Sequence, residues 1–298
     1  MWQVDVALNT AKALLPFQGT LRAFKRKLFP YSGDARNADL AFRQGLEQIA
    51  VLRRCGFAFG GRAVLDLGSG WFPIVPILAR IAGAHQVHLT DLERLLDRET
   101  LLASARFLHA RIAEIDTVLD VPAGRLETML TPPALAFDDL LRWFGLTYTV
   151  PFDSSSMPHV DLVMSRTVLE HVPPPILAKL FADFRDHLRD DGMLSHIIDH
   201  TDHRQHRDKS LSRIDFLRYS DTAWRLLTIN MQDYTNRLRH TDYLTLLADT
   251  GYEILFEDGK IDAPSVEDTR RMPLAARFKD IPPEILGTIV SHIVARPS

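Results

Sequence analysis

Two groups of residues in the 298-residue sequence have types and spacings that suit chemistry. The first is the turn Gly68-Ser69-Gly70, with Asp66 just before it and Asp91 placed 21 residues after Gly70. Glycines after a strand let the backbone approach a ligand closely, and an acid at this distance can hydrogen-bond ribose hydroxyls. The pattern predicts a nucleoside site. The alternative is that the glycines only shape a turn and Asp91 caps a helix.

Residues around this turn narrow the choice of ligand. A dinucleotide fingerprint needs a third glycine where this chain has Pro73, and bulky Trp71 precedes it. Asp66 is a poor neighbour for a diphosphate and a good one for an ammonium group. A ligand with a ribose and an ammonium group but no phosphate is S-adenosylmethionine, which we predict as the cofactor. A nicotinamide-dependent dehydrogenase is the rival within the same fold.

The second group is the run HIIDHTDHRQH, which holds four of the 12 histidines at the end of a predicted strand. An oxygen acceptor must lose its proton when it is methylated, and a histidine oriented by a carboxylate suits that step. We predict His203 as general base, with Asp199 or Asp202 as its partner and His200 as second choice. His171, in the run VLEHV, is expected to line the same crevice, with Glu170 as its partner or as a solvent-facing neighbour.

Two alternatives for the histidine run stay open. Two histidines and one or two carboxylates can hold a divalent cation, which lowers the pKa of a bound hydroxyl. A metal is therefore chemically possible, but no metal ligand is assigned. The run could also be a solvated polar loop.

The elements that must position these residues alternate between strand and helix. The apolar and alternating runs that predict strands are 62–67, 86–90, 146–150, 160–164, 193–198, 251–256 and 288–294. Predicted helices cover 74–81, 95–115, 138–144 and 176–188, and residues 116–145 are otherwise expected to be irregular. This order predicts an α/β fold with a doubly wound sheet, in which a late strand is inserted antiparallel at the edge.

Two further regions flank the predicted sheet. Residues 1–60 are expected to form an N-terminal helical cap with apolar positions from Leu40 to Leu52, and residues 61–298 one Rossmann-like domain. An insertion at about 200–245 is expected to form a substrate lid. The arginines and aromatic residues in it would suit a polar or sugar-like acceptor, or could form a helical pair with its own core. They are Arg213, Arg218, Arg237, Arg239, Tyr219, Trp224 and Tyr234.

Composition excludes several classes of protein. Lys plus Arg number 35 against 38 Asp plus Glu, so the net charge of −3 gives no basic excess for nucleic acid. A single cysteine, Cys55, excludes an internal disulfide framework and fits a cytoplasmic location. No run is apolar enough to predict a membrane span. The basic segment 20–28 would suit a solvated helix or, alternatively, an anionic membrane surface.

Four motifs together resemble class I S-adenosylmethionine-dependent methyltransferases. They are VLDLGSG (64–70), LTDL (89–92), PFD (151–153) and DLVMSRTVLEHV (161–172). The resemblance covers about residues 60–200 in motif order. It implies a seven-stranded sheet of order 3-2-1-4-5-7-6, with the cofactor at the carboxyl ends of the strands.

The resemblance also implies roles for individual residues. Those expected near the cofactor are Asp66, Gly68, Ser69, Gly70, Asp91, Leu92, Thr149, Val150, Ser165 and Arg166. Family members often have an acid for the adenine amino group where this chain has Thr149. The expected function is methyl transfer to an oxygen of a small molecule or sugar by a monomer or weak dimer. The alternative is a catalytically silent or non-methylating S-adenosylmethionine-binding protein, such as a cyclising enzyme or a regulatory scaffold.

Overall fold

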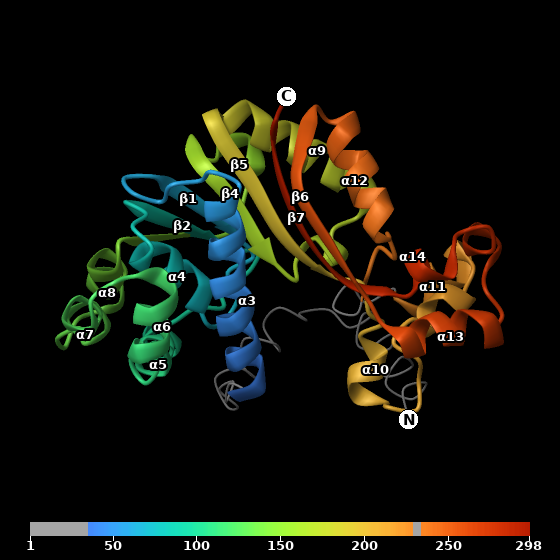
Figure 1. The fold of residues 1–298 in the computed structure, drawn as a ribbon, viewed down its shortest axis with the longest axis horizontal. Helices are drawn as coiled ribbons and strands as arrows, with labels where there is room; N and C mark the ends of the chain where they lie inside the picture. Colours follow the sequence, from blue (N-terminus) through green and yellow to red (C-terminus); the bar gives the residue numbers. More distant parts are fainter. Residues whose placement is uncertain (1–34, 229–233) are drawn as a thin grey trace, which may run out of the picture.

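A seven-stranded mixed sheet runs through the chain, with the order β3-β2-β1-β4-β5-β7-β6 (Figure 1). The computed structural model describes residues 35–228 and 234–298. The strands are β1 (Ala63–Leu67), β2 (Gln86–Thr90), β3 (Leu146–Thr149), β4 (Val160–Arg166), β5 (Leu188–Asp199), β6 (Tyr252–Ile261) and β7 (Thr288–Pro297). This is the strand order that the sequence resemblance implied.

Strand direction decides where functional side chains meet. β1 pairs in parallel with β2 and β4, and β4 with β5, so the carboxyl ends of these strands share one edge of the sheet. β7 runs antiparallel to both β5 and β6, which confirms the reversed strand that was expected late in the chain. A ligand crevice in an open α/β sheet forms at the carboxyl ends of its strands.

One face of the sheet is covered by helices from the first half of the chain. They are α3 (Ala35–Arg54), α4 (Ile74–Ile81), α5 (Arg98–His109), α6 (Ile112–Leu119), α7 (Ala123–Leu130) and α8 (Phe137–Phe144). Their apolar residues join inward-facing strand residues such as Val87 and Leu162 in one buried cluster. Helix α3 carries the pattern expected of the cap, with Phe42, Ile49 and Leu52 buried.

The other face is covered by α9 (Pro174–His187) and α12 (His240–Asp249). Phe181 and Phe184 of α9 and Tyr243 of α12 pack there against alternate strand residues, including Val163 and Leu194. Neighbouring residues of the central strands thus face opposite helical layers. Burial on both sides is why β1, β4 and the second part of β5 are largely apolar, whereas the edge strands β3 and β6 are partly exposed.

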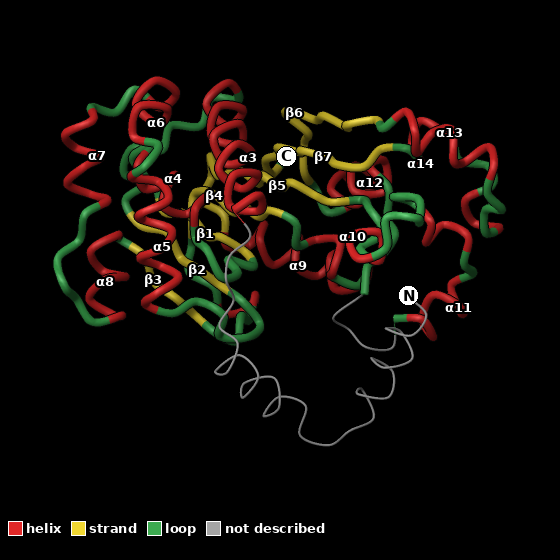
Figure 2. Tube along the Cα trace, turned by 90° about the horizontal axis from the view of Figure 1, so that it is seen from below, coloured by secondary structure: helices red, strands yellow, loops and turns green. Residues whose placement is uncertain are grey.

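A third apolar cluster lies beyond the end of β6 and the start of β7. It joins η3 (Asp215–Arg218) and α11 (Asp221–Leu227) to Met272, the residue after α13 (Ala263–Arg271), and to η5 (Ala276–Phe278) and α14 (Pro283–Leu286). Both views place α11, α13 and α14 on the opposite side of the molecule from α5 to α8 (Figures 1 and 2). α10 (Arg204–Arg207) lies between β5 and this small module in the chain.

Several sequence predictions were wrong in detail. The helix expected over 95–115 is broken at residues 110–111, and α6 continues to Leu119. Residues 116–145 are less irregular than expected, because Pro122 occupies the position just before α7 and starts that helix. Leu40, expected in the core, is 49% exposed.

Parts of the expected cap lie outside the described residues. These are residues 1–34, including the basic segment 20–28. Within the described part of the chain, no helix is long and apolar enough to cross a membrane.

Candidate functional site

A cavity of about 830 Å³ opens at the carboxyl ends of β1, β4 and β5. Its walls come from the first half of α3, the glycine turn, the start of α4, the ends of β4 and β5, and the segment around α10. The sequence-predicted residues that line it are Asp66, Gly68, Ser69, Gly70, Arg166, His171, Asp199 and His203. The cavity therefore brings the glycine turn and part of the histidine run together.

The glycine turn depends on backbone conformations that other residues rarely adopt. Gly68 and Gly70 have φ of 69° and 65°. A Cβ on Gly68 would also stand 2.5 Å from Cγ2 of Val168. The amide of Gly70 donates to Oδ2 of Asp91 at 3.1 Å, which ties the turn to the end of β2. Both glycines are thus required by geometry, as their sequence position suggested.

Opposite charges flank the turn within the cavity. Asp66 is only 6% exposed, and burial raises its pKa to about 7 against the opposing effects of Ser69 and the Arg166 guanidinium. Arg166 ends β4 and donates to Oε1 of Gln44 on α3 at 3.2 Å. Burial lowers the pKa of Arg166, although Asp66 opposes this. A carboxyl and a guanidinium in one cavity complement the two charged groups of an amino acid.

The residues expected beside ribose and adenine lie next to the cavity rather than in its wall. Asp91 accepts hydrogen bonds from the amides of Gly70 and Leu92, at 3.1 and 2.7 Å. Leu92 is 76% exposed, Thr149 is exposed and Val150 is half-buried. All of them stand at or just beyond the carboxyl ends of β2 and β3, where their roles stay predictions.

Ser165 does not lie where the resemblance placed it. Its side chain is buried, and its Oγ hydrogen-bonds Nδ1 of His196 at 2.8 Å. Side chains alternate along a strand, so when Ser165 points away from the cavity, Arg166 at the end of β4 points into it. A second residue, the one that follows the strand, also lines the cavity. That second residue is Thr167, whose φ is 53°. Sequence analysis missed Thr167.

His171 is part of the cavity wall and is held in a defined tautomer. It closes η2 (Leu169–His171), and its Nδ1 lies 2.9 Å from the carbonyl oxygen of Tyr234. Because a carbonyl oxygen only accepts, Nδ1 carries the hydrogen and Nε2 keeps its lone pair when the ring is neutral. Nε2 lies 4.0 Å from Oε1 of Glu170.

His203 lies beside Asp199, as one of the two expected pairings requires. Its Nε2 is 3.6 Å from Oδ2 of Asp199, whose Oδ1 accepts from the amide of Thr201 at 2.8 Å. Burial of Asp199 raises its pKa, but His203 and Thr201 outweigh this and hold that pKa below its usual value. The His203 ring lies 4.9 Å from the His171 ring and 5.0 Å from the His206 ring, between centroids.

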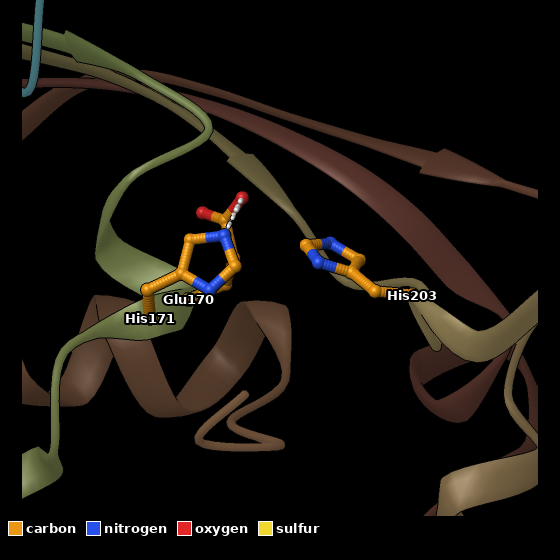
Figure 3. A group of neighbouring side chains, drawn as sticks. All are labelled: Glu170, His171 and His203. Atoms are coloured by element: carbon orange, nitrogen blue, oxygen red, sulfur yellow. Dashed lines mark ion pairs between the residues drawn. The ribbon is translucent and has the colours of Figure 1, made fainter. Parts of the chain in front are cut away.

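Glu170 is the residue that sequence reasoning undervalued. It was expected to be a partner or a solvent-facing neighbour of His171, and its exposure of only 2% rules out the second of these. Neither carboxyl oxygen has a hydrogen-bond partner among the described residues, and burial together with the nearby Asp199 raises its pKa well above the usual value. Glu170, His171 and His203 converge so that one ligand atom of each lies within 4.8 Å of the others (Figure 3).

His200 and Asp202 were expected in the crevice, and the structure places both elsewhere. His200 is 2% exposed, with Nδ1 at 3.0 Å from the Leu238 carbonyl and Nε2 at 2.6 Å from Oγ of Ser291. Its burial, with the charge of Arg239, lowers its pKa well below the usual value. These contacts leave neither ring nitrogen for a substrate.

Asp202 is committed to a buried ion pair. Its carboxylate accepts from Nε and Nη2 of Arg204 at 3.0 and 2.5 Å. Asp202 therefore does not orient His203. His206 and Lys209, which follow in the chain and were not selected, line the cavity instead.

Four of the expected arginines and aromatic residues of the insertion take part in packing: Arg237, Arg239, Trp224 and Tyr219. Arg237 donates to the carbonyls of Phe216 and Tyr219 at 3.0 and 2.6 Å, and buried Arg239 donates to the carbonyl of His200 at 3.0 Å. Trp224 packs in the third apolar cluster, with Tyr219 against it. This favours packing over an acceptor site for these two aromatic residues, although the core is shared with Met272, Phe278 and Leu286 and is not the insertion's own, as the alternative expected.

No protein-family model matches the chain, and no curated protein matches it either. Solved structures similar to it include an S-adenosylmethionine-dependent methyltransferase from Mesorhizobium loti, with 17% identity over 84% of this chain and 99% of that one, and a TM-score of 0.45. Another is the magnesium protoporphyrin IX methyltransferase from Synechocystis PCC 6803 with bound SAH, with 14% identity over 95% and 96% of the two chains, and a TM-score of 0.47. A geranyl diphosphate methyltransferase in complex with SAM has 14% identity over 90% and 93%, and a TM-score of 0.46. The fold assignment rests on the strand order and register described above.

Proposed function

We propose that the protein is an S-adenosylmethionine-dependent methyltransferase that acts on a small molecule or a sugar. The observation that carries the proposal is the cavity in which the carboxyl of Asp66 and the guanidinium of Arg166 flank a turn of two glycines in the left-handed conformation. Those charges match a zwitterionic amino-acid group, and the glycines leave room for a ligand against the backbone. The residues present thus fit the cofactor.

Each predicted cofactor residue has a physical task in this proposal. Asp66 would bind the ammonium group and Arg166 the carboxylate of the methionine part. Asp91 would accept from the ribose hydroxyls, because a carboxylate that takes two amide hydrogens keeps lone pairs for further donors. Residues at the ends of β2 and β3, Leu92, Thr149 and Val150, would border the adenine. When bound, S-adenosylmethionine supplies a methyl group on a positively charged sulfur.

The histidine end of the cavity would hold the acceptor. We propose an oxygen nucleophile, whose proton must leave as the oxygen attacks. His203, set beside Asp199 in the cavity wall, would assist that loss, and His171 lies next to it. Assistance by a positioned group is typically worth about 10²–10⁴ in rate.

The cofactor assignment is tested by calorimetry with S-adenosylhomocysteine. We expect binding to the wild type, strong weakening in Asp66→Asn and Asp91→Ala, and no change in the exposed control Asp258→Ala. A titration of the same sample with NAD tests the rival function, because a nicotinamide-dependent dehydrogenase would bind NAD. Failure of the wild type to bind S-adenosylhomocysteine would overturn the proposal, and normal affinity in Asp91→Ala would remove its ribose role.

Turnover needs its own measurement. Incubation with methyl-labelled S-adenosylmethionine and a panel of phenols and sugars should transfer label to an acceptor and release S-adenosylhomocysteine. Binding without label transfer to any acceptor would favour the silent or non-methylating alternative.

We further propose how the chain is divided into regions, where it is located and whether it associates. In this proposal, residues 1–60 act as a cap and residues 200–245 as a lid on the domain 61–298. Helix α3 of the cap and the segment around α10 of the lid both contribute to the cavity wall. The half-buried single Cys55 suits the reducing cytoplasm. A monomer or weak dimer is expected, which sedimentation at several concentrations tests.

A further inference from the structure

Glu170, His171 and His203 form a compact group of metal-ligand types at the acceptor end of the cavity. We propose that these three side chains bind one divalent transition-metal ion. The ion's binding is independent of the proposed methyltransferase function, whereas its role in catalysis rests on that function.

The buried carboxyl of Glu170 is the strongest indication that this group of side chains binds a cation. The side chain is 2% exposed, and neither of its oxygens is hydrogen-bonded within the described part of the chain. A buried carboxylate without a hydrogen-bond partner is costly, and most such groups in proteins are paired or coordinate a metal. A cation between Glu170 and the two imidazoles would satisfy it.

His171 is oriented as metal-binding histidines usually are. The Nδ1 hydrogen goes to the carbonyl oxygen of Tyr234, which fixes the ring and leaves the Nε2 lone pair on the side of Glu170. A histidine that donates its other ring hydrogen to a carbonyl or carboxylate is the common arrangement around protein metals.

His203 completes the group from a different element. Its ring crosses that of His171 at 63°, so the two imidazoles meet edge to face rather than stacked. Asp199, 3.6 Å from Nε2 of His203, is placed to orient that imidazole as a second-sphere carboxylate. Ligand atoms about 2 Å from a zinc ion lie roughly 3 to 4 Å apart, so the present spacing of at most 4.8 Å closes with small side-chain rotations.

The donor set indicates which ion is suitable. Two imidazoles and one carboxylate suit zinc, iron(II), cobalt or manganese, whereas magnesium and calcium prefer oxygen ligands throughout. Three protein ligands leave open positions, and His171 and His203 are both part of the cavity wall. The open positions would therefore face the acceptor.

The ion would change how His203 helps the acceptor lose its proton, because His203 would then bind the metal and would not act as a free base. The ion would lower the pKa of an acceptor hydroxyl, whose proton passes to solvent. The oxygen lone pair then forms the bond to the methyl carbon, and the carbon–sulfur bond breaks with its electron pair going to sulfur. The products are the methyl ether and S-adenosylhomocysteine.

The test is titration of the chelator-treated full chain with Co²⁺, followed by visible absorption, and with Zn²⁺ by calorimetry. We expect one ion per chain with an absorption band typical of mixed nitrogen and oxygen ligands. Glu170→Gln and His171→Ala should each weaken binding roughly 100-fold or more, because each removes a direct ligand. The matched control is His206→Gln, which changes the neighbouring cavity histidine and should leave the affinity unchanged.

Several outcomes would overturn the proposal. One is the absence of stoichiometric binding; another is binding that His206→Gln weakens while Glu170→Gln does not, which would indicate nonspecific chelation by the histidine run. Thermal melting of each variant checks folding, and His171→Gln, at a more exposed position, serves if Glu170→Gln does not fold. S-adenosylhomocysteine binding measured on the same samples keeps the two proposals apart. If the cofactor analogue binds and the metal does not, only the metal site is wrong and His203 acts as a free base.

Discussion

The two ends of the cavity are built in different ways. At the glycine turn, the wall is one short run of chain, and its shape comes from two left-handed backbone conformations and an amide bound to Asp91. At the histidine end, the wall is made of side chains from η2, the end of β5 and the turn after it. Their orientation depends on contacts with residues far along the chain, such as Tyr234.

This difference suits two kinds of ligand. A backbone-built site depends on few side chains and fits a ligand that never changes, such as a cofactor. A site built from side chains on several segments can be altered one residue at a time, which suits an acceptor that differs between enzymes. The comparison predicts that damage at the histidine end affects turnover, and that damage at the turn affects cofactor binding.

The largest expected effect is at His203. His203→Ala should lower single-turnover methyl transfer by about 10²–10⁴, because it removes the group that assists proton loss. S-adenosylhomocysteine affinity, measured by calorimetry, should stay unchanged. The matched variant His200→Ala should lower stability but not the turnover of the folded protein, because His200 bonds Leu238 and Ser291 outside the cavity. Wild-type turnover in His203→Ala would show that His203 does not assist methyl transfer.

The second effect distinguishes Asp202, in the turn after β5, from Asp199, the last residue of that strand. Asp202→Ala removes the bidentate partner of the buried Arg204 guanidinium, which keeps its ion pair with Asp215, so we expect a loss of about 2 kcal/mol of unfolding free energy. Urea unfolding followed by circular dichroism measures it. Asp199→Ala should instead lower turnover, with a smaller change in stability. An Asp202→Ala variant as stable as the wild type would show that this ion pair does not hold the loop.

The third effect is at Gly68. Gly68→Ala should cost about 1–3 kcal/mol of stability and weaken S-adenosylhomocysteine binding, because alanine is strained at φ of 69° and its Cβ would press on Val168. Thermal melting and calorimetry measure the two losses. Gly60→Ala is the control, since no atom lies within 4 Å of its would-be Cβ. Equal behaviour of the two variants would mean that the turn tolerates side chains.

The contrast between the backbone-built glycine turn and the histidines, which distant contacts position, also explains which features could be predicted from the sequence. The strands, their order and the glycine turn follow from local patterns, namely apolar runs ended by glycine or aspartate. Asp66 and Gly68 could be placed in a site because their position at the end of β1 decides their surroundings. Helix boundaries were less certain where Pro122 started a helix instead of ending one.

The histidine end could not be predicted to the same depth. His200 and His203 stand three residues apart, and only tertiary contacts decide that one bonds Ser291 of β7 and the other faces the cavity. The sequence left open whether Glu170 is a partner of His171 or a solvent-facing neighbour, because its burial depends on the packing of η2 against a distant segment, where the Glu170 carbonyl accepts from the amide of Asn236. A single sequence holds no signal for such pairings.

The smallest expected effect is a pH dependence that belongs to the turn alone. Burial raises the pKa of Asp66 to about 7 in the free protein, despite hydrogen bonding by Ser69 and the charge of Arg166, while Asp91 adds to the rise. An ammonium group binds the ionised carboxylate. Below about pH 7, binding must therefore also release a proton, and above it the carboxylate is already charged.

Calorimetry with S-adenosylhomocysteine from about pH 5.5 to about pH 8.5 should show this directly. Affinity should fall up to tenfold per pH unit below about 7, equal to about 1.4 kcal/mol, and level off above it. Arg166 stays charged over this range and cannot produce the slope. Asp66→Asn should bind weakly with no such slope, whereas His203→Ala should keep the wild-type slope because the pKa of Asp66 is set by burial, Ser69, Arg166 and Asp91. If Asp66→Asn keeps the wild-type slope, or if His203→Ala loses that slope, the titrating group belongs to the histidine run. The glycine turn and the histidines would then not have separate functions.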